Sequence, residues 1–99
     1  MDRMTRIREA LQGALTPLSL TVEDDSAAHA GHAGAREGGH FRVTLVSAAF
    51  RGRSALERHR LVYAAVAELM QGDIHALNIT ARTPEESVRL STLTDREPV

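Results

Sequence analysis

Apolar residues near the start of the chain recur at the spacing of an α-helix. Ile7, Leu11 and Leu15 fall on one face, and charged or polar residues fill most of the positions between them. Proline disfavours the helical conformation of the residue before it, so the helix cannot continue through Pro17. The pattern therefore predicts an amphipathic helix from Asp2 to about Leu15.

Two later segments alternate apolar and polar residues, which is the period of a half-buried β-strand. The first has its apolar residues at Leu18, Leu20 and Val22, and the second is predicted from His40 to Val46. Consecutive strands usually pair as neighbours, so we expect an antiparallel hairpin. Its connection, from Asp24 to Gly39, would be a long loop, and loops of this length inside a compact domain are more often functional than not.

The middle of the chain predicts a second helix. Ser54 can cap its start, so that the first helical residue would be Ala55, and Gly72 can end it. The apolar stripe predicted for this helix comprises Leu56, His59, Tyr63, Val66 and Met70, widened by Val62 and Leu69.

The last predicted elements are a strand and a short helix. Alternation from Ile74 to Arg82 predicts the strand, with His75 near its start on the same face as Leu77 and Ile79. The Thr-Pro-Glu-Glu run that follows is typical of a helix start and predicts a short helix to about Leu90.

The order of the predicted elements is α-β-β-α-β-α, which favours an α+β fold of two layers. We expect a three-stranded mixed sheet with the helices on one face. The second and third strands are joined through a helix and would pair in parallel. A chain of 99 residues can build one hydrophobic core but not two. The expected organisation is a single domain over residues 1–91 and a flexible C-terminal tail over residues 92–99.

Composition narrows the classes of function. A net charge of −1 argues against avid non-specific binding to nucleic acid. The longest apolar runs are a few residues, and the charged N-terminus does not read as a secretory signal, so we expect no membrane contact and a cytoplasmic location. The sequence contains no Ser-His-Asp grouping, phosphate-binding glycine loop or zinc-protease motif with supporting context. We therefore expect that this protein is not an enzyme. Because cysteine is absent, an iron–sulfur cluster bound here would take its thiolates from other molecules.

The five histidines are the main candidates for binding chemistry. His29 and His32 lie in the predicted loop among Ala and Gly, and taken alone, loop histidines at this spacing are more often incidental than metal ligands. His59 falls on the predicted stripe of the second helix, where a hydrogen-bonded structural role outweighs a ligand role. Rigid backbone would hold His75 at the start of a strand, with one ring nitrogen facing solvent.

A basic cluster surrounds the start of the second predicted helix: Arg51, Arg53, Arg58 and Arg60. These arginines could contact phosphate groups from the helix and its preceding turn. They could equally form a solvated helix face, and the slightly acidic chain favours this simpler interpretation.

Three segments together resemble the BolA family: SAAHAGHAGAREGGHFRV, LVSAAFRGRSALERHRLVYAAVAEL and IHALNITARTPEE. The resemblance runs in register over roughly Met4 to Glu86. Phe50, Gly52, the Arg58-His59-Arg60 run and the His75-Ala76-Leu77 run match the most diagnostic positions of the family. The loop form HAGHAGA is similar to that of histidine-loop members of alphaproteobacterial type.

The resemblance implies an α-β-β-α-β fold similar to class II KH domains and a complex with a monothiol (CGFS-type) glutaredoxin. In such complexes a bridging [2Fe–2S] cluster is held by the glutaredoxin cysteine, a glutathione thiolate and two BolA ligands. The matching residues here are His75 and His29, with His32 as the alternative loop ligand. The implied role is iron–sulfur trafficking or iron sensing. The isolated chain would carry no cofactor and would be a monomer or a weak homodimer.

The family resemblance also implies an alternative function. Some members are described as DNA-binding transcription regulators of cell shape and stress responses, a role that would use the segment Arg51 to Arg60. The GxxG nucleic-acid loop of KH domains is not present at Arg51-Gly52-Arg53-Ser54, which weakens this alternative.

The resemblance also implies that His59 is a structural or interface residue. A loop that closes on a partner's iron would be poorly ordered without that partner.

Overall fold

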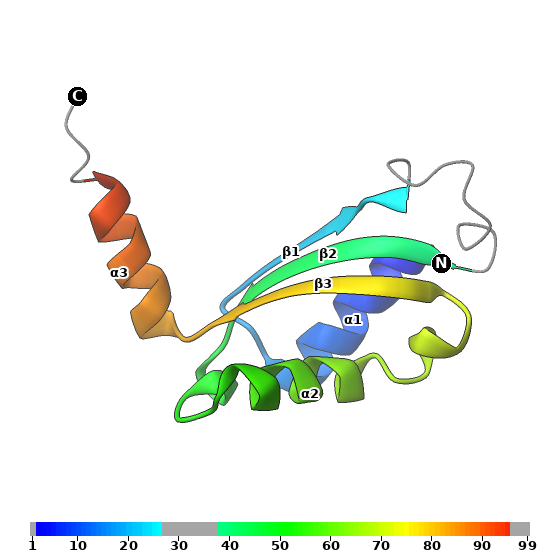
Figure 1. Ribbon diagram of the computed structural model, residues 1–99, viewed down its shortest axis with the longest axis horizontal. Coiled ribbons are helices and arrows are strands. Elements are labelled where there is room, and N and C mark those ends of the chain that lie inside the picture. The colour runs from blue at the N-terminus through cyan, green and yellow to red at the C-terminus, as the bar shows by residue number, and fades with distance from the viewer. Residues whose placement is uncertain (1, 27–37, 96–99) are drawn as a thin grey trace.

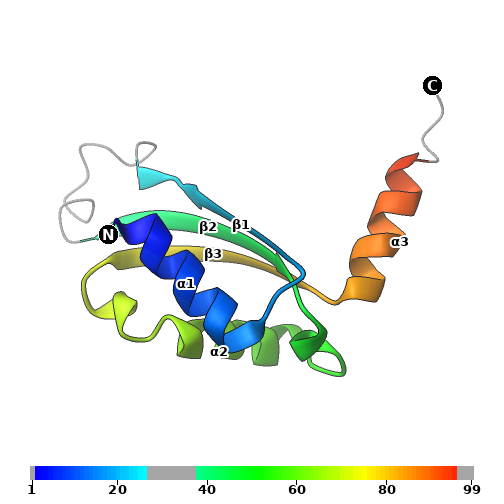
Figure 2. The same cartoon turned by 180° about the vertical axis from the view of Figure 1, so that it is seen from behind.

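Two helices cover one face of a small sheet. The computed structural model describes residues 2–26 and 38–95, and its helices α1 (Arg3–Leu15) and α2 (Ala55–Ala65) lie side by side against that face (Figures 1 and 2). Helix α1 begins as predicted, because the Asp2 carboxylate accepts a hydrogen bond of 2.8 Å from the Thr5 N–H. Within residues 2–26 and 38–95, no helix covers the opposite face of the sheet (Figure 1).

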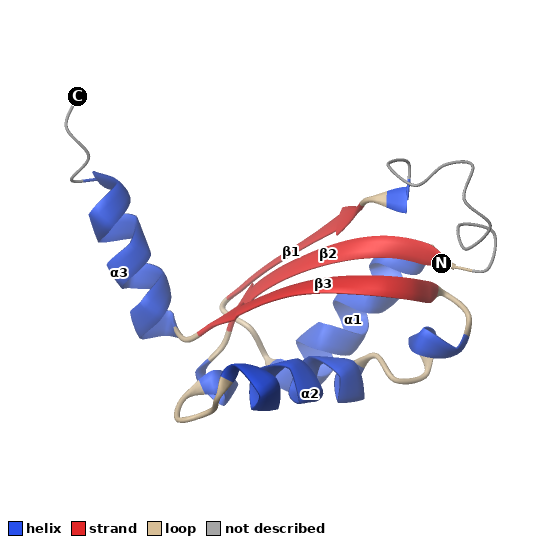
Figure 3. Ribbon diagram, in the orientation of Figure 1, coloured by secondary structure: helices blue, strands red, loops and turns tan. Residues whose placement is uncertain are grey.

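The sheet contains three strands in the order β1-β2-β3 (Figure 3). Strand β1 (Ser19–Asp24) pairs antiparallel with β2 (Gly39–Val46), and β2 pairs parallel with β3 (Ile74–Arg82). This mixed sheet and the α+β order confirm the predicted fold class. Leu18 is the exception to the predicted alternation, because it precedes β1 and its side chain is 75% exposed.

The core lies between the sheet and the two helices. Helix α1 contributes Ile7 and Leu11, strand β2 contributes Val43 and Leu45, and all four side chains are fully buried. Phe50 comes from the short 3₁₀ helix η3 (Ala48–Phe50) and is the largest fully buried side chain.

The predicted stripe of the second helix is wrong in part. Helix α2 ends at Ala65, and a separate 3₁₀ helix, η4 (Leu69–Gln71), leads to β3. Val62 is fully buried on the core side, whereas Leu56 is 58% exposed and Tyr63 is 39% exposed. The apolar residues of the buried face and those of the exposed face each recur every three to four residues. Spacing alone therefore does not distinguish the helix face that contacts the sheet from the face beside it.

The last helix, α3 (Pro84–Asp95), leaves the end of β3 and points away from the two layers (Figure 1). It continues past the predicted end at Leu90, and the division into a domain and a tail at residue 92 stays a prediction. Its first turn is anchored by a reciprocal cap, in which Thr83 and Glu86 each accept a hydrogen bond from the other's backbone N–H. No helix in residues 2–26 and 38–95 has the length and apolar character needed to cross a membrane.

Candidate functional site

Two histidines meet at one end of the sheet. His75 is exposed near the start of β3, and half-buried His40 stands near the start of the neighbouring strand β2. Their imidazole rings have centroids 5.1 Å apart and planes inclined by 50°. The structure therefore places the predicted ligand His75 beside a second imidazole that the sequence reasoning did not single out.

A β-bulge sets the position of His75. Gly39 pairs with Ile74, but His40 pairs with Ala76, so His75 is the extra residue on β3. Ile74 is buried, and two of the following side chains, Leu77 and Ile79, also pack against the core. His75 does not share that packed environment, contrary to the strict alternation predicted for the strand, and its side chain is exposed instead.

The backbone segments approach closely at this end of the sheet because Gly38 precedes β2 and Gly39 begins it. A Cβ atom on Gly38 would lie 2.9 Å from the Gly72 carbonyl oxygen and 3.0 Å from the backbone nitrogen of His75. The Gly39 N–H donates to the Asp73 carbonyl oxygen at 3.1 Å. The start of β2 is thus held directly against the start of β3.

The segment with the loop histidines leaves and re-enters the sheet beside this pair. The Asp24 carboxylate accepts from the Ser26 N–H at 2.8 Å, and hydrogen bonds from Ser26 lower the pKa of Asp24. The Ser26 hydroxyl oxygen accepts from the His40 N–H at 3.1 Å, and the Asp25 N–H donates to the His40 carbonyl at 2.7 Å. His29 and His32, with the expectation about loop order, lie outside the described residues.

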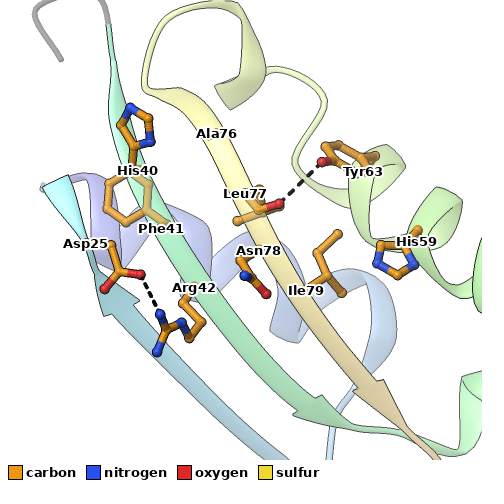
Figure 4. A pocket seen from close by; sticks show the side chains of 10 residues that line it. All are labelled: Asp25, His40, Phe41, Arg42, His59, Tyr63, Ala76, Leu77, Asn78 and Ile79. Atoms are coloured by element: carbon orange, nitrogen blue, oxygen red, sulfur yellow. Dashed lines mark hydrogen bonds and ion pairs between the residues drawn. The ribbon is translucent and has the colours of Figure 1, made fainter. Parts of the chain in front are cut away.

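A shallow surface groove of about 650 Å³ runs from His40 along the outer edge of β3 (Figure 4). His59 and Tyr63 of α2 line its other side, and the Tyr63 hydroxyl donates to the Leu77 carbonyl at 3.4 Å. Asp25 also faces the groove and forms an ion pair of 3.2 Å with Arg42. The groove thus has two imidazoles in its lining, those of His40 and His59.

His59 has a partner within its own helix. Its Nδ1 lies 2.8 Å from the Ala55 carbonyl oxygen, so this nitrogen carries the hydrogen of the bond and Nε2 is the nitrogen left to face the groove. This contact suits a structural residue on a partly exposed helix face. Its role in an interface stays a prediction.

Of the four arginines in the segment Arg51 to Arg60, two form ion pairs with the described side chains of α3 and two do not. Arg51 donates to the Glu85 carboxylate through Nε at 2.9 Å, and Arg58 donates to Glu86 through two nitrogens at 2.7 and 3.2 Å. Only Arg53 and Arg60 of the four predicted arginines are exposed with no ion pair within 4.0 Å among the described side chains. The arrangement ties α3 to the rest of the domain and reduces the positive charge that a phosphate would meet.

Arg58 and Glu86 form the more buried of these pairs. The Arg58 guanidinium is the main cause that lowers the pKa of Glu86 to about 2 from its ordinary value of 4.5. Arg58 also donates to the Ala81 carbonyl at 3.1 Å, so a single side chain joins α2, β3 and α3.

We expect Glu86→Gln to lower the free energy of unfolding at neutral pH and to lose this effect in acid. Because the folded-state pKa is lowered, the pair contributes stability that is present above the unfolded value near 4.5 and is lost as the pH falls towards about 2. Glutamine retains an oxygen that can accept from the Thr83 N–H, so the variant removes the charge and keeps the cap. Urea unfolding of both proteins across this pH range measures the difference.

The matched control is Glu85→Gln, which removes the more exposed carboxylate paired with Arg51. Exposed ion pairs contribute little, so this variant should change stability less than Glu86→Gln at neutral pH. An equal effect of the two variants, or a difference between Glu86→Gln and the wild type that persists unchanged in acid, would contradict the assignment.

The two histidines do not form a complete metal centre within the described part of the chain. In residues 2–26 and 38–95, no group of three or more His, Asp or Glu side chains is placed to hold a metal ion, and the sequence has no cysteine. A metal or cluster at His75 would therefore need further ligands from elsewhere.

Comparison with known proteins gives one consistent result. The family model described as BolA-like protein matches residues 11–86. The chain is 44% identical over 90 residues to Protein BOLA1, chloroplastic, of Arabidopsis thaliana, covering 87% of this chain and 56% of that protein. It is 41% identical over 81 residues to the DNA-binding transcriptional regulator BolA of Escherichia coli strain K12, covering 82% of this chain and 75% of that protein.

The solved structures agree with the sequence matches. The BolA domain of SufE1 from Arabidopsis thaliana superposes with a TM-score of 0.78 at 46% identity, covering 87% of this chain and 96% of that domain. This chain spans only about half of the length of relatives such as the Arabidopsis BOLA1 protein, at 56%. Proteins of the matched family are non-enzymatic.

Proposed function

The chain belongs to the BolA family, and we propose that it binds a monothiol glutaredoxin and shares a [2Fe–2S] cluster with it in iron–sulfur trafficking or iron sensing. The observation that carries the proposal is the position of His75. Its side chain is exposed near the start of β3 and lies next to Gly38 and His40, and His40 in turn bonds to Ser26; the segment with His29 and His32 lies between Ser26 and Gly38 in the chain.

The histidines of the chain can supply two of the four ligands that such a cluster needs. Imidazole nitrogens can replace two of the four thiolates of a [2Fe–2S] cluster, as in Rieske centres, and this replacement raises the reduction potential. The chain has five histidines and no cysteine, so it can supply imidazoles alone. In this proposal the glutaredoxin cysteine and a glutathione thiolate would supply the remaining ligands, and the cluster would supply one-electron chemistry when bound.

His75 and His29 are the proposed ligands, with His32 as the alternative, which makes the chain a histidine-loop member of the family. The backbone of β3 orients His75, while the loop side chain would come from the segment between Ser26 and Gly38. The groove beside β3 supports docking of a partner near His75, because its lining includes His40, whose ring centroid lies 5.1 Å from that of His75. The cytoplasmic location and the alphaproteobacterial type stay predictions, and the Arabidopsis relative is named as chloroplastic.

The test is reconstitution with a CGFS-type glutaredoxin, glutathione, ferrous iron and sulfide. The expected product is a heterodimer with one [2Fe–2S] cluster, whose visible absorption and circular dichroism differ from those of the glutaredoxin's own cluster. Its reduction potential should be higher than that of the all-thiolate cluster. A mixture in which all the iron stays with glutaredoxin homodimers would refute the proposal.

The loop ligand can be identified by comparing His29→Ala with His32→Ala. We expect His29→Ala to lower the yield of heterodimer cluster by at least about 10-fold, a loss comparable with that caused by removing supporting partners of metal ligands. His32→Ala should retain the wild-type spectrum. The reverse result would transfer the role to His32, and normal clusters in both single variants and in the double variant would remove the loop from the coordination sphere.

DNA binding is the second candidate, and one observation favours it: the name of the Escherichia coli relative. The ion pairs of Arg51 with Glu85 and Arg58 with Glu86 argue against it here, because they occupy half of the proposed phosphate-binding arginines. Fluorescence anisotropy with duplex DNA at moderate salt separates the two. Affinity that falls steeply with salt and is lost in the Arg53→Ala/Arg60→Ala double variant would place DNA binding first.

A further inference from the structure

His40 and His75 are neighbouring imidazoles, a common type of metal ligand, and neither belongs to the segment between Ser26 and Gly38. We propose that these two residues bind one divalent transition-metal ion, of the class of Zn²⁺, Ni²⁺ or Cu²⁺, on the chain without a partner. The site goes beyond the proposed cluster because it uses His40, has one metal ion and requires no thiolate.

The separation of the two rings matches a shared ion. A zinc–nitrogen bond of about 2.0–2.1 Å places the metal about 3.2 Å from the centre of each imidazole. Two such rings at a tetrahedral angle then have centroids about 5.2 Å apart. The centroids of His40 and His75 lie 5.1 Å apart. The ring planes are inclined by 50°, so the two imidazoles are not stacked face to face.

The backbone holds this spacing before any metal binds. His40 is fixed through both of its backbone polar groups, since its N–H donates to Ser26 and its carbonyl accepts from Asp25. His75 is the extra residue of the bulge, and bulges commonly re-aim a side chain near functional sites. Two ligands on adjacent, hydrogen-bonded strands lose little freedom when a metal joins them.

The chemistry of the ligands selects the class of metal. Imidazole suits Zn²⁺, Cu²⁺ and Ni²⁺, whereas Ca²⁺ and Mg²⁺ require oxygen ligands. The carboxylate that faces the same groove, Asp25, is engaged by Arg42 and is not needed as a ligand. The exposed position of His75 leaves room for water at the remaining coordination positions.

A bound ion would occupy the imidazole that the proposed cluster requires. If the proposed function holds, a divalent metal and the cluster therefore compete for His75. The chain would share a cluster only when His75 is free of divalent metal, which links cluster transfer to the local concentration of zinc or copper.

The experiment titrates Zn²⁺ into the untagged full chain by isothermal calorimetry and follows the histidine side-chain nitrogens by NMR. We expect one site per chain and perturbed nitrogen signals for His40 and His75. His40→Ala and His75→Ala should each weaken binding by at least about 10-fold. The controls are His59→Ala and the His29→Ala/His32→Ala double variant, both of which should bind as the wild type does. Far-UV circular dichroism checks that each variant is folded.

Three results would overturn the inference: no zinc site on the wild-type chain, unchanged affinity in either the His40 or the His75 variant, or loss of the site in the loop double variant. Its failure is distinguishable from failure of the proposed function. Cluster sharing by a chain that binds no zinc refutes the mononuclear site alone. Zinc binding by a chain that never forms the heterodimer cluster refutes the proposed function alone.

Discussion

His75→Ala is expected to abolish the cluster shared with glutaredoxin while leaving the fold intact. The side chain is exposed, and its removal creates no cavity, so the free energy of unfolding should change by less than about 0.5 kcal/mol. The cluster, in contrast, would lose a ligand held by rigid backbone at the open end of β3. We expect the heterodimer spectrum to revert to that of the glutaredoxin cluster, and transfer to an acceptor protein to fall to the rate of glutaredoxin alone.

The matched control for His75→Ala is His59→Ala, which removes a histidine from the groove that is also lined by His40, the neighbour of His75. His59 bonds to Ala55 within α2, so an effect on docking would lower the yield of heterodimer without changing the spectrum of each cluster formed. Equal spectra for the wild type and His75→Ala, at equal yield, would mean that His75 is not a ligand. Equal spectral changes in both variants would point to a disturbed interface instead.

Strand β3 shows how far the sequence determines this site. Its bounds, Ile74 to Arg82, agree with the prediction, because glycine before the strand and proline after it limit the alternating run. The bulge could not be predicted in this way. It arises from pairing with β2, and alternation within one strand contains no information about an extra residue opposite a neighbour.

The contact between His40 and His75 can be inferred from the sequence. The two residues stand near the beginnings of strands that were expected to pair in parallel, and parallel strands begin at the same edge of a sheet. Together, these two expectations place the two imidazoles next to each other. Their distance and inclination depend on the bulge and on the close approach at Gly38, so only the structure defines them.

The predicted buried stripe of the second helix is wrong in part for a different physical reason. Its sequence has apolar or amphipathic residues on more than one face, including Leu56 and Tyr63 on the exposed side and Val62 and Val66 on the buried side. Burial is decided by the position of the helix against α1 and the sheet, which a single amphipathic pattern does not specify. Leu56 and Tyr63 therefore expose apolar surface on α2. The Tyr63 side chain reaches β3, where its hydroxyl donates to the Leu77 carbonyl.

Phe50→Ala is expected to be the most destabilising single change in the domain. Phe50 is fully buried, and truncation of a buried phenylalanine costs about 3–5 kcal/mol through lost transfer energy and the cavity that remains. The local backbone offers little relaxation, because the Ser47 hydroxyl donates to the Leu15 carbonyl at 2.6 Å and accepts from the Ala49 N–H at 3.1 Å. The 3₁₀ helix that carries Phe50 is thereby tied to α1.

A loss of this size is a large part of the roughly 5–15 kcal/mol that a native domain has in total. We therefore expect the urea midpoint of Phe50→Ala to fall sharply with an unchanged slope, and the thermal midpoint to fall by more than about 12 °C. Leu18→Ala is the matched control, since it removes an apolar side chain that is 75% exposed. Its stability should stay within about 0.5 kcal/mol of the wild type. Similar midpoints for the two variants would mean that η3 does not hold the core together.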